Sequence, residues 1–116
     1  MNQKTKSMEV SLKNQVAIVT GASSGIGSGI AKCMAEAGAT VIINHSSEKS
    51  TDSANEVLKE IKEAGGEGMV IRCDVSKEDE VIAMFAEVVE KYGTVDILVN
   101  NAGIQKDAKF TEMTLD

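Results

Sequence analysis

Four short apolar runs, separated by stretches with helical periodicity, constrain the fold of this chain more than any other feature. The runs occupy residues 16–19, 39–44, 68–73 and 95–100. They are rich in Val, Ile and other apolar residues, which is typical of strands buried on both faces of a parallel sheet. Between consecutive runs, apolar residues recur every three to four positions, as they do along one side of an amphipathic helix. The sequence therefore predicts an α/β fold.

Three helices are expected between these strands, each with one buried stripe. The first stripe is predicted to contain Ile26, Ile30, Met34 and Ala37. The second is predicted to contain Ala54, Val57, Leu58, Ile61 and Ala64. The third is predicted to contain Val81, Ile82, Phe85, Val88, Val89 and Tyr92. Ser76 is expected to cap this last helix, with Asp79 three residues later in a capping-box position.

The order of the strands follows from the handedness of their connections. Right-handed crossovers favour the spatial order 3-2-1-4, so the chain reverses direction between strands 1 and 4. The expected architecture is the N-terminal half of a Rossmann-type, doubly wound parallel sheet in three α/β/α layers. We expect residues 1–11 to be a polar tail and residues 12–116 to form one domain, incomplete at its C-terminal end, with strand 4 as an exposed apolar edge. Ligands bind such sheets at the carboxyl ends of the strands, beside the reversal point.

A glycine-rich loop, "TGASSGIG" at residues 20–27, joins the first strand to the first helix. Such a loop leaves the first N–H groups of the helix unpaired and directed at one spot, which favours an anion such as a pyrophosphate. Gly21 would make the tight turn, Gly25 would let phosphate approach the main chain, and Gly27 would let the helix pack closely. The hydroxyls of Ser23 and Ser24 can add hydrogen bonds. The spacing G-x-x-x-G-x-G differs from the commoner G-x-G-x-x-G, and a sharp turn without a ligand is the alternative.

Two further motifs stand at the ends of later strands: "CDV" at residues 73–75 and "NNAG" at residues 100–103. With the glycine loop, they make residues 10–116 resemble the short-chain dehydrogenase/reductase family. Within that family, the segments "VIIN" and "GTVDILVNNAGI" look most like those of glucose 1-dehydrogenases and 3-oxoacyl-acyl-carrier-protein reductases. The resemblance implies a nicotinamide dinucleotide as cofactor.

The resemblance also implies which residues bind that cofactor. Asp74 would accept a hydrogen bond from the adenine amino group, and Val75 would lie against the ring. The backbone of Asn101, Ala102 and Gly103 would lie beside the two riboses. Together with the loop, the expected cofactor-binding residues are Gly21, Ser23, Ser24, Gly25, Ile26, Gly27, Asn44, Asp74, Val75, Asn101, Ala102 and Gly103.

The end of the second strand is expected to choose between NAD and NADP. An acidic residue about twenty positions after the first glycine binds the ribose diol and repels a 2′-phosphate. Asn44 occupies that position, and neutral residues follow it at positions 45–47, with Lys49 close by. NADP is therefore favoured and NAD remains possible, although Ser24 stands where many NADP-using relatives carry Arg. His45 is equally compatible with a solvated loop position and with a cofactor contact.

The catalytic residues that the family uses all follow the "NNAG" motif. They are a serine, a Tyr-x-x-x-Lys pair and an asparagine, and this sequence ends before them. Its only tyrosine, Tyr92, has Asp96 four residues later and belongs to an apolar stripe. We therefore expect no catalytic residue and no activity in these 116 residues, which would be the dinucleotide-binding part of a dehydrogenase or reductase (EC 1.1.1) acting on a small carbonyl or alcohol substrate. The alternative is a non-catalytic dinucleotide-binding module.

Composition excludes several other classes. A net charge of −6 and a pI near 4.8 argue against nucleic-acid binding. Without a secretory signal or an 18-residue apolar run, a cytoplasmic protein is expected, with a homotetrameric parent by resemblance. Cys33 and Cys73 are too few and too far apart for a metal site, and both are expected to be reduced and buried.

Overall fold

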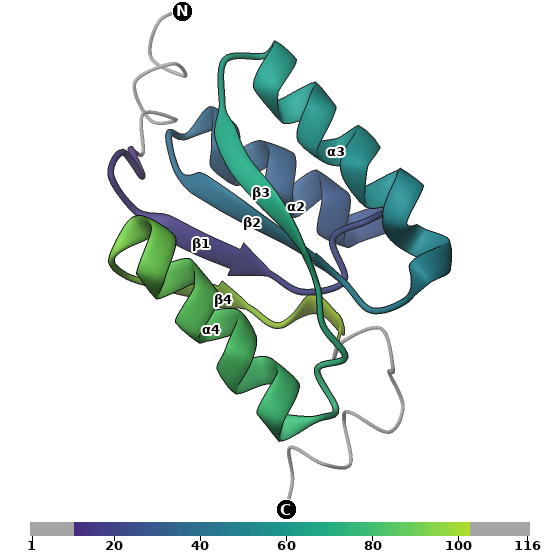
Figure 1. Ribbon diagram of the computed structural model, residues 1–116. Coiled ribbons are helices and arrows are strands. Elements are labelled where there is room, and N and C mark those ends of the chain that lie inside the picture. The colour runs from purple at the N-terminus through teal and green to yellow at the C-terminus, as the bar shows by residue number, and fades with distance from the viewer. Residues whose placement is uncertain (1–10, 103–116) are drawn as a thin grey trace, which may run out of the picture.

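The computed structural model describes residues 11–102, in which four strands form one parallel sheet. They are β1 (Val16–Val19), β2 (Thr40–His45), β3 (Glu67–Arg72) and β4 (Ile97–Val99). The spatial order is β3-β2-β1-β4, which confirms the predicted topology (Figure 1). The polar tail up to residue 10 and Gly103 lie outside the described residues.

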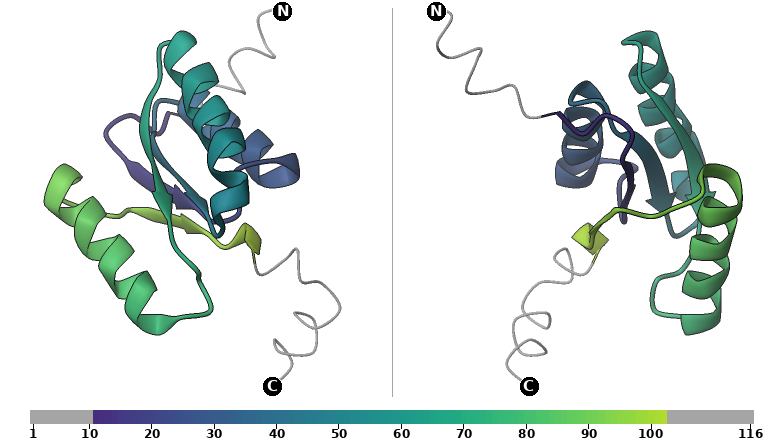
Figure 2. Two further views of the ribbon diagram at one scale, coloured as in Figure 1. Left: turned by 45° about the vertical axis from the view of Figure 1, so that its right-hand side comes forward. Right: turned by 90° about the vertical axis from the view of Figure 1, so that its left-hand side faces the viewer.

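The helices are α2 (Gly25–Glu36), α3 (Thr51–Glu63) and α4 (Glu78–Tyr92), with a short 3₁₀ turn, η1 (Glu48–Ser50), before α3. α2 and α3 cover one face of the sheet and α4 covers the other (Figure 2). Within residues 11–102, no helix is long and apolar enough to cross a lipid bilayer. The three layers are those expected from the alternation of strands and helices.

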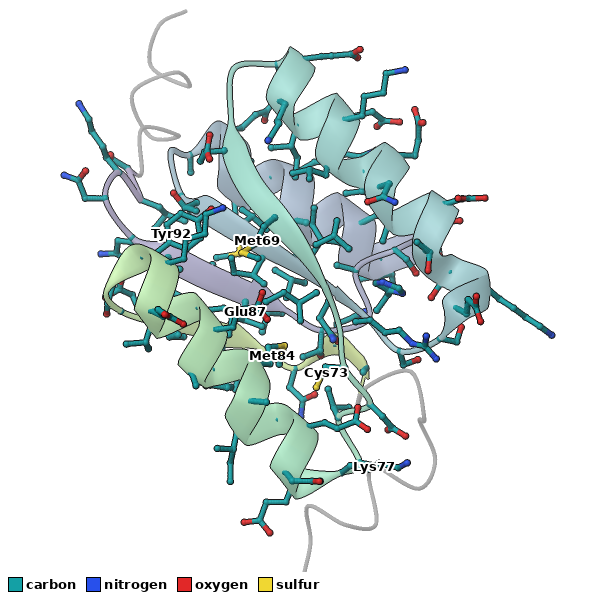
Figure 3. All side chains as sticks on the ribbon, in the orientation of Figure 1. Met69, Cys73, Lys77, Met84, Glu87 and Tyr92 are labelled. Atoms are coloured by element: carbon teal, nitrogen blue, oxygen red, sulfur yellow. The ribbon has the colours of Figure 1, made fainter. Side chains whose placement is uncertain are left out.

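The strands separate two cores. In β1, Ala17 and Val19 pack toward α2 and α3, whereas Val16 and Ile18 pack toward α4. Figure 3 shows Met69, Met84 and Tyr92 between α4 and the sheet. Because both faces of β1 and β2 are covered, their apolar runs are continuous rather than alternating.

The buried stripes of two helices differ from those predicted. Ile26 is 70% exposed, and α2 instead buries Gly27 and Ala31, because these small residues let the helix lie close to the sheet. In α4, Ile82 and Val89 are 62% and 46% exposed, while Met84, which the prediction left out, is buried beside Val88. The other members of both stripes pack against the cores or are partly buried, so the prediction was wrong at individual positions and not about which side of each helix faces the sheet. The stripe of α3 is confirmed at Ala54, Val57 and Ile61, with Ala64 exposed at the C-cap.

The start of α4 also differs from the prediction. The helix begins at Glu78 with Lys77 at the N-cap, and no side chain caps it. Ser76 instead donates its hydroxyl to Asp74 Oδ1 over 2.7 Å. Because α4 begins at Glu78, Asp79 lies in its first turn, between Glu78 and Glu80. Three carboxylates there stabilise the positive end of the helix dipole without a capping box.

The strand β4 forms one edge of the described sheet, as predicted. Leu98 is 52% exposed on this strand. At the start of the strand pair, Val16 N donates to Asp96 Oδ2 over 2.8 Å. This bond joins two segments that are 80 residues apart in the chain.

The two cysteines occupy different environments. Cys73 is buried, as predicted, but Cys33 is exposed on α2, so the expectation that both thiols are buried was wrong for Cys33. Burial raises the pKa of the Cys73 thiol, and the negative charges of Glu80 and Asp74 raise it further.

We expect the two thiols to react with a disulfide reagent such as DTNB at well-separated rates. Cys33 should be modified first, and Cys73 at least about tenfold more slowly, because a buried thiol with a raised pKa forms little accessible thiolate. Absorbance at the thionitrobenzoate band follows both phases. Replacing Cys33→Ser should remove the fast phase alone, and a fast phase that persists in that variant would contradict the assignment.

Candidate functional site

The candidate site lies at the carboxyl edge of the sheet, where four segments meet. They are the glycine loop after β1, the end of β2, residues 73–75 after β3 and residues 100–102 after β4. The pairing of Val19 with both Ile43 and Val99 brings the ends of β2 and β4 to either side of the loop. The reversal of the chain between β1 and β4 therefore coincides with the glycine loop.

The glycine loop presents an uncapped helix end. Gly21 and Gly25 have φ values of +61° and +59°, the left-handed conformation that favours glycine. α2 begins at Gly25, its N-cap Ser24 makes no side-chain capping bond, and its first turn contains no acidic residue. A Cβ built on Gly25 would meet no atom within 4 Å, so the space before this helix end is open. Main-chain N–H groups at such an end suit an anion.

Gly27 has a different role from Gly25, because it allows close packing. A Cβ at this position would overlap the carbonyl oxygen of Gly21 and would lie 2.5 Å from Asn101 Nδ2. The close packing predicted for this glycine is therefore against Gly21, at the start of its own loop, and against Asn101, two residues after β4.

The segment after β4 holds the other side of the loop. Asn101 is 1% exposed and donates its Nδ2 to Gly21 O over 3.0 Å. Ala102 N donates to Thr20 Oγ1 over 2.9 Å. Asn101 and Ala102 are helical. The Asn101 Oδ1 atom is buried and has no hydrogen-bond partner in the described part of the chain.

Sequence reasoning missed Thr20 as a site residue. Its N–H donates to Val99 O over 3.0 Å, and its hydroxyl lies 3.3 Å from Asn100 Oδ1, so it joins the start of the loop to the end of β4. A hydroxyl residue closing an otherwise apolar run was the available signal.

The end of β2 is buried rather than exposed. The side chain of Asn44 is 1% exposed, and His45 is 3% exposed. His45 Nδ1 lies 2.9 Å from both Ser47 O and Ser50 Oγ, which shows that His45 is not a solvated loop residue. Asn44 Oδ1 accepts from Gly21 N, while the two N–H donors of its Nδ2 are shared among three main-chain carbonyls within 3.3 Å. Both polar ends of Asn44 are therefore used inside the protein.

The segment after β3 combines an internal turn with core packing. Asp74 Oδ1 accepts from both Ser76 N and Ser76 Oγ, and Asp74 N donates to Glu80 Oε1 over 2.9 Å. Val75 is half-buried and packs against the core on the α4 face. The loop residues Ser24, Gly25 and Ile26 are exposed, and Ser23 is half-buried. The structure thus brings the predicted loop, β2, β3 and β4 residues to one edge, apart from Gly103.

Tyr92 lies at the other end of the domain. Figure 3 shows it at the far end of α4 from Cys73, which belongs to the candidate site. Its hydroxyl is buried and has no partner among the described residues, and burial, with a contribution from Glu67, raises the pKa of Tyr92. This tyrosine is a core residue, as expected from its position in the apolar stripe.

Comparison with known proteins identifies relatives of this chain. The family model described as short chain dehydrogenase matches residues 15–116. The 3-oxoacyl-(acyl-carrier-protein) reductase FabG of Staphylococcus epidermidis is 51% identical over 94 residues, which are 81% of this chain and 38% of that protein. A crystal structure of hydroxysteroid dehydrogenase from Escherichia coli matches with a TM-score of 0.74 and 41% identity, over 81% of this chain and 39% of that one.

A further solved structure is that of a 7α-hydroxysteroid dehydrogenase complexed with NADH and 7-oxo glycochenodeoxycholic acid. It matches with a TM-score of 0.74 and 41% identity, over 81% of this chain and 36% of that one. The chain therefore spans less than two fifths of the length of each of these relatives. With a family model that matches all but the first 14 residues, the chain belongs to the short-chain dehydrogenase family.

Proposed function

We propose that this chain is the nucleotide-binding part of an NAD(P)-dependent oxidoreductase. The observation that carries the proposal is the uncapped N-terminus of α2, which opens at Gly25 beside the end of β4. The parent protein would reduce a small carbonyl compound or oxidise the corresponding alcohol, as a cytoplasmic enzyme. The likeness to a 3-oxoacyl reductase and to hydroxysteroid dehydrogenases supports this reaction class.

The residues present fit a dinucleotide. The N–H groups at the start of α2 and the hydroxyls of Ser23 and Ser24 would hold the pyrophosphate, with Gly25 and Ile26 at the open helix end. Gly21 and Gly27 would hold the loop in shape from inside. Asp74 and Val75 would bind the adenine. The main chain of Asn101, Ala102 and Gly103 would line the ribose side, while the buried Asn101 side chain holds Gly21 of the loop.

NADP is the proposed cofactor, with NAD as a weaker ligand. The end of β2 carries no acidic side chain in residues 44–47, so nothing there would repel a 2′-phosphate. The following turn η1 carries one charge of each sign, Glu48 and Lys49. When bound, the nicotinamide ring supplies or accepts the hydride, and the chain's own contribution is to bind and orient the dinucleotide.

Replacing Gly25→Ala should test the loop directly. We expect the affinity for NADPH to fall by about tenfold or more, because the methyl group would occupy the open space before the helix end. Titration of the nucleotide against the chain, followed by calorimetry or by ¹⁵N chemical shifts, measures the affinity. The same titration with NADH gives the preference between the two cofactors.

Gly93→Ala is the matched control for this variant. Gly93 also has a positive φ, of +87°, and a Cβ there would meet nothing within 4 Å, but it ends α4, far from the loop. Both substitutions therefore impose similar backbone strain. Equal affinity for NADPH in the two variants would contradict the proposed phosphate site, whereas a loss confined to Gly25→Ala would support it.

A further inference from the structure

The side chain of Asn44 connects three segments of the candidate site. Its Oδ1 accepts from Gly21 N over 3.3 Å, at the first glycine of the loop. Its Nδ2 lies within 3.3 Å of His45 O and Ile71 O and 3.1 Å from Cys73 O. The last of these carbonyls belongs to the residue that directly precedes Asp74. One amide group thus joins the phosphate side of the site to its adenine side.

Main-chain hydrogen bonds join the same segments as these side-chain hydrogen bonds. Ala22 N donates to Asn44 O over 2.9 Å, and Cys73 N donates to His45 O over 2.8 Å. The end of β2 is therefore held to the loop on one side and to the end of β3 on the other. At 1% exposure, the Asn44 side chain cannot reach solvent or a ligand without breaking these contacts.

The neutral amide suits this position chemically. An amide offers one acceptor and two donors, and here the acceptor meets an N–H while the donors meet carbonyl oxygens. A carboxylate would turn its second oxygen toward carbonyl oxygens, and a hydroxyl is too short to span the loop and two strand ends. The contacts therefore require an amide, independently of any ribose that binds nearby.

We infer that Asn44 is a positioning residue, which fixes the glycine loop at a set distance from the adenine-binding end of β3 so that one nucleotide can reach both. This inference rests on the proposed function, because it supposes that a nucleotide spans the two segments. It assigns Asn44 an action through Gly21 and Cys73 rather than a direct contact with the 2′ position. The Asn44 amide is expected to be in place before the nucleotide binds.

The test compares ligands that reach one segment with a ligand that reaches both. Adenosine can contact only the adenine side, inorganic pyrophosphate only the loop, and ADP both. In the variant Asn44→Ser, the affinity for ADP should fall about tenfold, while the affinities for adenosine and for pyrophosphate should change less than about twofold. A general loss of stability would not change the ratio of these affinities in the folded fraction.

Asn55→Ser is the control, because Asn55 is exposed on α3. It should leave all three affinities and their ratio unchanged. If Asn44→Ser weakens all three ligands equally, or weakens none, the positioning role is overturned. If the unmodified chain binds no ADP, the proposed function fails, and the inference fails with it.

A second measurement decides the question if the variant does not fold. In the unmodified chain without ligand, the side-chain NH₂ protons of Asn44 should exchange with solvent far more slowly than those of Asn55, and their shifts should change little when ADP is added. Rapid exchange of the Asn44 amide in the folded, ligand-free chain would overturn the inference.

Discussion

Gly27→Ala is expected to destabilise the domain by about 3 kcal/mol, which is a large share of the stability of a domain of this size. The added methyl group would overlap the carbonyl oxygen of Gly21 and would lie 2.5 Å from Asn101 Nδ2. Neither neighbour can move freely, because the two are hydrogen-bonded to each other over 3.0 Å. Relief of the overlap must therefore break that bond or displace α2 from the loop. Thermal unfolding followed by far-UV circular dichroism measures the loss.

Gly29→Ala, two residues along the same helix, provides the contrast. A Cβ at Gly29 would meet nothing within 4 Å. Since alanine is the better helix former, this variant should be more stable than the unmodified chain by about 0.5–1 kcal/mol. Two identical substitutions in one helix should thus have opposite signs. If both destabilise to the same extent, the effect comes from the helix as a whole and not from the contact with Asn101.

Asn44→Asp is expected to cost about 3–5 kcal/mol near neutral pH. The substitution is nearly isosteric, but it places a carboxylate oxygen against the carbonyls of Ile71 and Cys73 in place of an N–H donor. The charged form is buried without a compensating cation, and a buried carboxyl of this kind can have its pKa raised by about 3 units, or about 4 kcal/mol. Denaturant unfolding at several pH values measures the effect.

The pH dependence of this variant has a definite sign. The folded-state pKa of the introduced carboxyl group is raised above its unfolded value of about 3.9. The variant should therefore be most stable relative to the unmodified chain below about pH 4, and should lose stability as the pH rises through the folded pKa. Asn55→Asp, on the exposed surface of α3, should show neither the loss nor the pH dependence. A pH-independent cost in Asn44→Asp would mean that the carboxylate has reached solvent.

The topology could be predicted from the sequence because it depends on local patterns. The apolar runs and the glycines between them determine four strands and three helices, and the handedness of crossovers then fixes the order β3-β2-β1-β4. Which residues at the margin of a helix stripe become buried depends instead on tertiary packing. α2 buries Gly27 and Ala31 and leaves Ile26 exposed. Close packing of this helix against the glycine loop outweighs the burial of one larger side chain.

The candidate site was predictable as a set of segments but not as a set of contacts. The motifs placed the loop, Asp74 and Asn101 at one edge, and the structure brings them there. The burial of Asn44 depends on hydrogen bonds across strands that no local pattern reveals. Thr20 could be noticed as a hydroxyl residue at the end of an apolar run, but its bond to Ala102 could not. For the same reason, the sequence could not show that Cys33 faces solvent while Cys73 is enclosed.

The hydrogen bonds to Gly21 have a consequence for how the domain folds. Its N–H is bonded to Asn44 and its carbonyl to Asn101, whose positions are 23 and 80 residues further along the chain. The loop's glycines alone leave many conformations open, so its final shape depends on these distant partners. During synthesis, the first three strands can pair before the fourth has emerged, but the loop is held on both sides only after Asn101 has docked. The glycine loop is thus synthesised before both of its partners and reaches its native geometry only after they have docked.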